Sequence, residues 1–254
     1  MIPDYTVYWA PGCSSCLKTK EFLVQHHIEF ESINVAEKPE AMADLRELGL
    51  RSFPVIRRGD QAAFCQDLQD VADFVGVALV KQQLEPNQLI EKTNLVLSAA
   101  QRFMRQLDEN QLSDHFAGRD RPFRDLAYHI FMVVQAFLEA GDGGTLSDAA
   151  FFRRCPDHLT QGDAIASAGE EVRKALLDWW EKKQSDLPRQ VDTYYGTRSI
   201  ESVLERTAWH AAQHCRQLQA VVERYGIEPD GPLGPAELDG LPLPNNIYDN
   251  ESQM

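Results

Sequence analysis

The chain has 254 residues, of which 43% are hydrophobic and 25% charged, a globular balance that suits two domains with separate cores. Its formal net charge of −14 argues against a nucleic-acid partner, because phosphate backbones are bound by clustered lysine and arginine. The sequence has no apolar run of the roughly 18 residues that span a membrane, and its start lacks a secretory signal. We therefore expect a cytoplasmic protein with no membrane partner.

The first 80 residues alternate between short strand patterns and helix patterns. β-Branched and aromatic residues mark the strands, and glycine and proline punctuate them. The resulting βαβαββα order predicts a compact α/β domain over residues 1–80. The expected strands cover 5–9, 28–35, 53–56 and 61–64, and the expected helices cover 13–26, 39–48 and 68–79.

Pro86 begins a different pattern, in which we find no convincing strand. Four amphipathic helices joined by loops predict an all-α four-helix bundle over 86–226, whose core is a natural place for a metal or cofactor. The last segment, 227–254, carries six acidic residues but no lysine or arginine, and it is rich in proline and glycine, so we expect an extended or disordered tail. The four predicted helices cover about 86–109, 122–140, 161–183 and 199–225.

A Cys-x-x-Cys pair, Cys13 and Cys16, falls where the first strand should pass into the first helix. A helix N-terminus favours a thiolate, so we predict that Cys13 is the exposed nucleophile and Cys16 the more buried resolving thiol. Metal ligation is the competing use, but zinc normally takes four ligands and the chain has no second pair of this kind. An inert docking domain is a further alternative.

The residues around the pair resemble the glutaredoxin branch of the thioredoxin fold. The resemblance rests on YWAPGCSSC at 8–16 followed by SFPV at 52–55, and it covers residues 1 to about 80. It implies a cis Pro54, preceded by Phe53, that lies against the disulfide and presents backbone to a bound thiol. It also implies that Arg51 contacts a glutathione carboxylate.

Two positions depart from the glutaredoxin pattern. Ala10 stands where the family has a lysine, and FCQD at 64–67 replaces the Gly-Gly that receives the γ-glutamyl group. These departures leave open a NrdH-like domain that a thioredoxin system reduces, beside one that uses glutathione. Cys65 is either a third reactive thiol or a small buried hydrophobe.

His210 and His214 lie four residues apart, on or beside the apolar stripe of the last predicted helix. Buried imidazoles need a partner for each ring nitrogen, and a shared metal ion would supply one; ordinary hydrogen bonding or partial exposure is the alternative. His129 lies beside the apolar row of another helix. Three histidines leave metal positions open, as catalytic sites do. His158, in a polar loop, is the reserve ligand.

The histidine pattern resembles the DinB-like four-helix family, which includes metal-dependent thiol S-transferases that use mycothiol, bacillithiol or glutathione. The matching residues are His129 and the His210-x-x-x-His214 pair followed by Gln217-Leu218, within residues 86 to about 225. The resemblance implies that the histidines hold a divalent metal, zinc or nickel. It also implies a homodimer, because such proteins often dimerise.

Together the two halves predict a metal-dependent, thiol-dependent transferase. Its metal centre would activate glutathione or another low-molecular-weight thiol for attack on an electrophilic substrate, and Cys13 and Cys16 would resolve a mixed disulfide. A thioredoxin or glutathione system would keep the cysteines reduced. The alternative is a thiol-disulfide oxidoreductase whose helical bundle binds a client or partner protein. A third hypothesis is the transfer of a metal or metalloid between cysteines and histidines.

Overall fold

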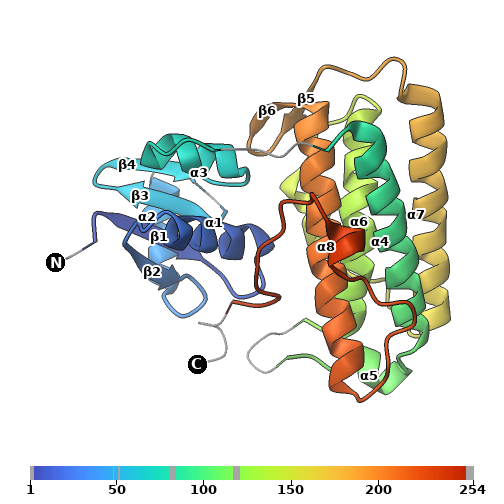
Figure 1. Cartoon of the computed structure of the whole chain (residues 1–254). Coiled ribbons are helices and arrows are strands. Elements are labelled where there is room, and N and C mark those ends of the chain that lie inside the picture. The colour runs from blue at the N-terminus through green and yellow to red at the C-terminus, as the bar shows by residue number, and fades with distance from the viewer. Residues whose placement is uncertain (1–2, 48, 51, 80–83, 117–120, 250–254) are drawn as a thin grey trace. The chain divides into compact units, whose positions relative to one another are not determined.

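The computed structural model describes residues 3–47, 49–50, 52–79, 84–116 and 121–249 (Figure 1). The chain divides into two compact units. The first unit combines Met1–Gln82 with Pro244–Met254, and the second is Gln83–Leu243, so the predicted tail is shared between them. None of the helices in the described part of the chain is long and apolar enough to cross a bilayer.

The first unit is a mixed sheet with helices on both faces. Its strands are β1 (Tyr5–Trp9), β2 (Phe30–Asn34), β3 (Val55–Arg58) and β4 (Gln61–Phe64), and its helices are α1 (Ser14–Gln25), α2 (Pro39–Glu47) and α3 (Leu68–Val75). The strand order is β2-β1-β3-β4, with β1 parallel to β2 and antiparallel to β3, which forms a hairpin with β4. The predicted element order is confirmed, and it fits a thioredoxin-like fold.

The alternation of side chains along β1 and β3 divides the core of this unit into two layers. Val7 pairs with Ile56, and both pack in one layer with residues of α1 and α3. Tyr8 pairs with Val55, and both pack in the other layer with Leu45 of α2. The sheet is therefore covered by α1 and α3 on one face and by α2 on the other.

Several bounds in the first unit differ from the prediction, among them the start of β2 at Phe30 instead of residue 28. α3 ends at Val75 instead of residue 79, because Gly76 adopts a left-handed φ of 73° that terminates the helix. β3 covers Val55–Arg58 instead of 53–56, because its pairing with β4 continues to Arg58 opposite Gln61. The Phe53–Pro54 segment thus lies just before the strand, as a connection.

The second unit is mostly helical, as predicted. Its helices are α4 (Pro86–Arg105), α5 (Glu109–Ser113), α6 (Phe123–Gly141), α7 (Gly162–Lys183), α8 (Ile200–Arg224) and α9 (Pro235–Leu238), together with the 3-10 helix η1 (Asp148–Phe152). The helices α4 and α6 each pack against both α7 and α8, so these four long helices enclose a common core (Figure 1). Gly169 of α7 lets the Phe131 ring of α6 approach closely, since a Cβ there would lie 2.2 Å from Phe131 Cζ.

The prediction of no strand in this unit is wrong. β5 (Gln190–Thr193) and β6 (Gly196–Ser199) form a hairpin directly before α8. The two tyrosines between them make the turn, and Gly196 follows with a φ of 101°. The sequence favours a loop here because these strands, QVDT and GTRS, carry only one large aliphatic side chain, Val191. The first long helix also ends early, at Arg105, because Asp108 and Gln111 form a capping box that starts α5.

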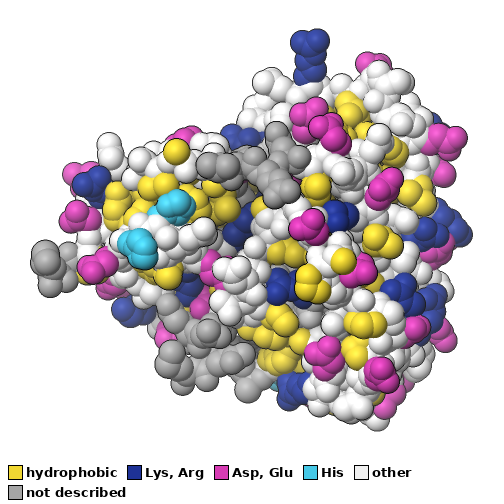
Figure 2. Space-filling model, viewed as in Figure 1, with side chains coloured by type: hydrophobic (Ala, Val, Ile, Leu, Met, Phe, Trp, Pro, Cys, Tyr) yellow, Lys and Arg dark blue, Asp and Glu magenta, His cyan; other side chains and the backbone are white. Residues whose placement is uncertain are grey.

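Charged side chains of both signs lie on the face of the molecule that Figure 2 presents. Figure 2 shows acidic and basic groups interspersed on the face that it presents, without a continuous basic patch among the described residues.

Candidate functional site

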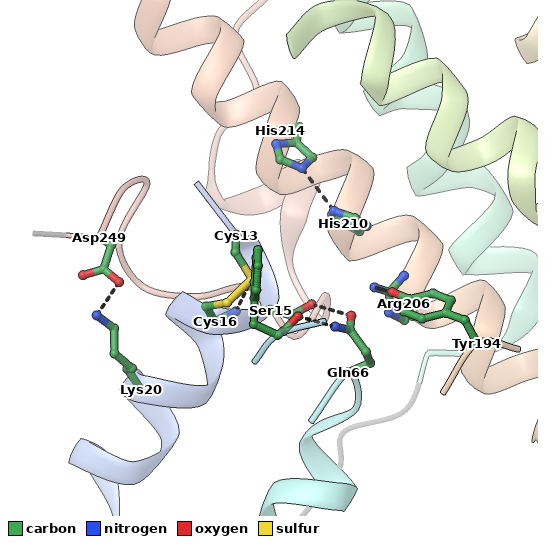
Figure 3. The surroundings of a disulfide bond; sticks show 11 residues. Cys13, Ser15, Cys16, Lys20, Gln66, Tyr194, Arg206, His210, His214 and Asp249 are labelled. Carbon is green, nitrogen blue, oxygen red and sulfur yellow. Dashed lines mark hydrogen bonds and ion pairs between the residues drawn. A yellow bond between two sulfur atoms is a disulfide. The ribbon is translucent and has the colours of Figure 1, made fainter. Parts of the chain in front are cut away.

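Cys13 and Cys16 form a disulfide where β1 passes into α1, with their Cα atoms 5.2 Å apart (Figure 3). Cys13 is the N-cap of α1, and its Sγ accepts a hydrogen bond from the Cys16 N–H at 3.1 Å. Cys13 is partly exposed, whereas Cys16 is fully buried. The unpaired N–H groups and dipole of α1 favour a thiolate at Cys13. This arrangement is the one expected for an accessible attacking thiol and a protected resolving thiol.

The Phe53–Pro54 peptide bond is cis, and Pro54 is buried. Gln66, in the connection between β4 and α3, joins this segment to α1, and Figure 3 shows its contact with Ser15. Its Nε2 donates to the Phe53 carbonyl at 2.8 Å, and its Oε1 accepts from Ser15 Oγ at 3.2 Å. One buried amide therefore ties the first turn of α1 to the cis-proline segment. The predicted contact residue Arg51 lies outside the described residues.

The other three cysteines are buried, and none has a lowered thiol pKa. Burial raises the pKa of Cys65 to about 12 and that of Cys155 to about 11, and it also raises the pKa of Cys215. All three are therefore neutral thiols near pH 7. Cys65 packs in the core layer of the first unit, which corresponds to the buried-hydrophobe interpretation and not to a third reactive thiol.

His129 of α6 and His210 and His214 of α8 come together inside the second unit. One ring nitrogen from each histidine lies within 4.8 Å of the others, and the Nε2 atoms of His210 and His214 are 3.1 Å apart (Figure 3). The side chains are buried, with exposed fractions of 4%, 8% and 2%. The three residues predicted as ligands are thus placed in one cluster, while His158 is exposed elsewhere.

The environment of the cluster opposes protonation of its imidazoles. Burial lowers the pKa of His129 and of His210 well below the ordinary value of 6.5, and the charges of nearby His214, Arg121 and Arg206 lower it further. Both rings are therefore neutral near pH 7 and have a lone pair to offer. Within the described part of the chain, the Nδ1 atoms of these two histidines have no hydrogen-bonding partner.

Gln217 fixes the third imidazole. Its Oε1 lies 2.8 Å from His214 Nδ1, and Gln217 is itself only 2% exposed. Because an amide oxygen only accepts hydrogen bonds, His214 Nδ1 carries the proton and Nε2 is left unprotonated, toward His210. A hydrogen bond of this kind is the usual device that orients a metal-ligating histidine.

Aromatic rings and one guanidinium group lie beside the histidines. Phe151 of η1 has its ring centroid 6.1 Å from that of His129 and 5.7 Å from that of His210. The Arg206 guanidinium lies 5.4 Å from the Phe151 centroid and donates to the Tyr194 hydroxyl at 3.0 Å. Burial raises the pKa of Tyr194 to about 12, so its hydroxyl stays protonated. A fixed positive charge thus stands one helical turn before His210.

Comparison with known proteins identifies relatives of the first unit. Residues 5–62 match the family model described as glutaredoxin. The Glutaredoxin-like protein NrdH of Lactococcus lactis subsp. lactis is 40% identical over 57 residues, which are 22% of this chain and 79% of that protein. The chain belongs to the glutaredoxin family. The corresponding NrdH protein of Escherichia coli K12 is 40% identical over 55 residues, 22% of this chain and 68% of the relative. The uncharacterized protein YusI of Bacillus subtilis is 40% identical over 43 residues, 17% of this chain and 36% of that protein.

Membership of the glutaredoxin family concerns the first unit. The matched residues include the dithiol and the cis-proline segment and end at residue 62, before the second unit begins. The first unit is therefore a glutaredoxin-like redox domain with a Cys13–Cys16 disulfide. The histidine cluster lies outside the matched region.

Sequence reasoning missed three residues that shape these sites. Gln66 was noted only as part of a departure from the family pattern, although its side chain holds the dithiol helix. Phe151 lies on a short 3-10 helix with no periodic signal. Arg206 could have been found, because it lies four residues before His210 and so falls on the same helix face.

Proposed function

We propose that the protein is a metal-dependent, thiol-dependent transferase, with a divalent metal site in a DinB-like bundle and a glutaredoxin-like domain that handles disulfides. The observation that carries the proposal is the convergence of three buried, neutral imidazoles on one point. Three protein nitrogens leave coordination positions free, as in catalytic rather than structural zinc sites.

The spacing of the nitrogens supports the metal assignment. With zinc–nitrogen bonds of about 2.0–2.1 Å, two ligand nitrogens at ordinary angles lie about 2.9–3.4 Å apart. The 3.1 Å between the Nε2 atoms of His210 and His214 falls in this range. The third nitrogen, within 4.8 Å, would have to approach the pair by up to about 1.4–1.9 Å to reach this spacing. Two neutral imidazoles at this distance share either a proton or a metal cation. We propose that they share a cation, zinc or nickel.

The chain's own residues would hold and orient the reactants. A divalent metal bound by the histidines supplies a Lewis acid that activates a thiol as a nucleophile. Gln217 keeps the His214 lone pair directed into the site, and the Arg206 guanidinium supplies a positive charge beside it. We propose glutathione or a similar low-molecular-weight thiol as the nucleophile and an electrophilic small molecule as its target.

The glutaredoxin-like domain would supply the thiol chemistry around that reaction. Cys13 attacks a mixed disulfide and releases one thiol, and Cys16 then attacks Cys13 to release the second and form the disulfide. Two electrons from a thioredoxin or glutathione system restore both thiols. A tether between the two activities raises their effective concentration for each other.

Elemental analysis of the full-length protein, purified without chelator, tests the proposal. We expect about one zinc or nickel ion per chain in the wild type and almost none in His210→Ala, since two nitrogens hold a metal much more weakly than three. His158→Ala is the matched control, because it removes an exposed histidine of the same unit. Equal metal content in wild type and His210→Ala would overturn the proposal.

A second candidate is a thiol-disulfide oxidoreductase whose helical unit binds a client protein. The observation that favours it is the extent of the family match, which covers the redox domain alone. It predicts that the wild type carries no bound metal. It also predicts full disulfide reduction by the variant in which His129, His210 and His214 are all changed to Ala. Thiol-dependent transfer that disappears in this triple variant would reject the second candidate.

A further inference from the structure

A segment close to the C-terminal end of the described chain, residues 244–249, belongs to the redox unit and is held by α1. Both carboxylate oxygens of Glu21 accept hydrogen bonds from it. The Asn245 N–H donates at 2.6 Å, and the Asn246 N–H and Nδ2 donate at 2.9 and 2.7 Å. We call residues 244–249 the strap. These charge-assisted bonds fix its course along the helix.

The strap contributes Asp249 to a buried ion pair with Lys20 of α1. Asp249 Oδ2 lies 2.5 Å from Lys20 Nζ, and the two side chains are 9% and 6% exposed (Figure 3). Lys20 Nζ also lies 3.7 Å from the centroid of the Trp9 ring, the last residue of β1. Replacing one partner of a buried pair removes its compensation of the other charge, and a buried charge acts over a long range in a medium of low dielectric.

The pair is next to the dithiol. Lys20 follows Cys16 by four residues on α1, and helical side chains lean toward the N-terminus, so Lys20 covers the turn that contains Cys16. Trp9, which contacts the ammonium, leads directly into the Cys13 turn. Figure 3 shows Lys20 and Asp249 among the surroundings of the disulfide.

We propose that Asp249 is a positioning residue for the dithiol, which sets its reduction equilibrium by compensating the charge of Lys20. The inference rests on the redox part of the proposed function and not on the metal site. A positive charge near a cysteine stabilises its thiolate and thus the reduced state. With Asp249 in place this effect is cancelled, and the disulfide is favoured.

The equilibrium is defined by exchange with dithiothreitol. The Cys13–Cys16 disulfide takes two electrons and two protons and becomes two thiols, while dithiothreitol loses the same and closes to its cyclic disulfide. Full-length protein is equilibrated with mixtures of the two dithiothreitol forms, quenched with an alkylating reagent and read by mass. This measurement needs no turnover.

Asp249→Asn should raise the equilibrium constant for reduction by about tenfold, which is about 30 mV for a two-electron couple. Lys20→Gln should shift it in the opposite direction, and the double variant should return to within about twofold of wild type. Asp239→Asn is the matched control, because it makes the same change at an exposed tail residue of the other unit. Asn245→Pro removes one strap donor without changing any charge and should shift the constant in the direction of Asp249→Asn.

Equal constants for Asp249→Asn and Asp239→Asn would overturn the proposal, as would a double variant no closer to wild type than the single ones. Should Asp249→Asn fail to fold, Asn245→Pro carries the same test. A wild type that reduces no disulfide substrate, but whose constant still responds to Asp249→Asn, would reject the oxidoreductase function and keep this inference.

Discussion

The two candidate sites are built in opposite ways. The dithiol is local: both cysteines lie within one turn at the start of α1, and the strand before them fixes their direction. The histidine cluster is assembled from α6 and α8, which α7 separates along the chain, so it exists only when the bundle is packed. The first site depends on one junction, whereas the second depends on the register of whole helices.

This contrast predicts that the two activities can be lost separately. Cys13→Ser should lower disulfide reduction by at least about 100-fold, because no other described cysteine offers a partly exposed sulfur at a helix N-terminus. Metal content should not change. An insulin or hydroxyethyl disulfide assay, with elemental analysis in parallel, measures both, and Cys155→Ala serves as the control. Loss of metal in Cys13→Ser would show that the sites are coupled.

Metal should stabilise the helical unit that carries the histidine cluster, and not the redox unit. Zinc at about 100 times its dissociation constant should add about 2.7 kcal/mol to the unfolding free energy of a unit that binds it when folded. Thermal or urea unfolding measures this gain. We expect it in the wild type and not in His210→Ala or His214→Ala. A chelator should reverse the gain. The same gain in the variants would place the metal elsewhere.

Gly169→Ala tests the register of the helices. The new Cβ would lie 2.2 to 2.6 Å from atoms of the Phe131 ring, so α6 and α7 must move apart. Overpacking of this kind costs about 1–3 kcal/mol, against about 1 kcal/mol gained in helix propensity. We expect a net loss of up to about 2 kcal/mol and weaker metal binding, with unchanged disulfide reduction. Phe131→Leu in the same chain should restore part of the loss.

The smallest effect should come from Glu170. The Arg173 guanidinium, assisted by Gln101, holds the pKa of Glu170 to about 2, below its ordinary value of 4.5. Its stabilisation is therefore complete above pH 4.5 and is lost as the pH falls toward 2. Glu170→Gln should cost less than about 1 kcal/mol at pH 7, because the pair is partly exposed. The difference from wild type should vanish near pH 2; a constant difference would contradict this explanation.

How far the sequence predicts each site follows from the same contrast. The dithiol and cis-proline are carried by short motifs, and the alternation of the strands predicts the order of the elements around them. Gln66 escapes prediction, because its partners Ser15 and Phe53 are distant in the chain and no local pattern links them.

The histidine cluster is predictable only in part. His129, His210 and His214 stand out because imidazoles interrupt or border apolar stripes. Phe151 does not, because the 3-10 helix that carries it is too short to leave a periodic signal. Its place beside the histidines comes from tertiary packing alone.

The docking of the strap has a consequence for how the chain is made. The helical unit is an insertion within the redox unit, whose last piece follows it in the sequence. On a ribosome that adds about 5–20 residues per second, the nascent dithiol domain therefore waits roughly ten to thirty seconds before Asp249 is synthesised. During that interval Lys20 lacks the Asp249 carboxylate, so we expect a higher equilibrium constant for reduction of the nascent domain than of the chain that includes the strap.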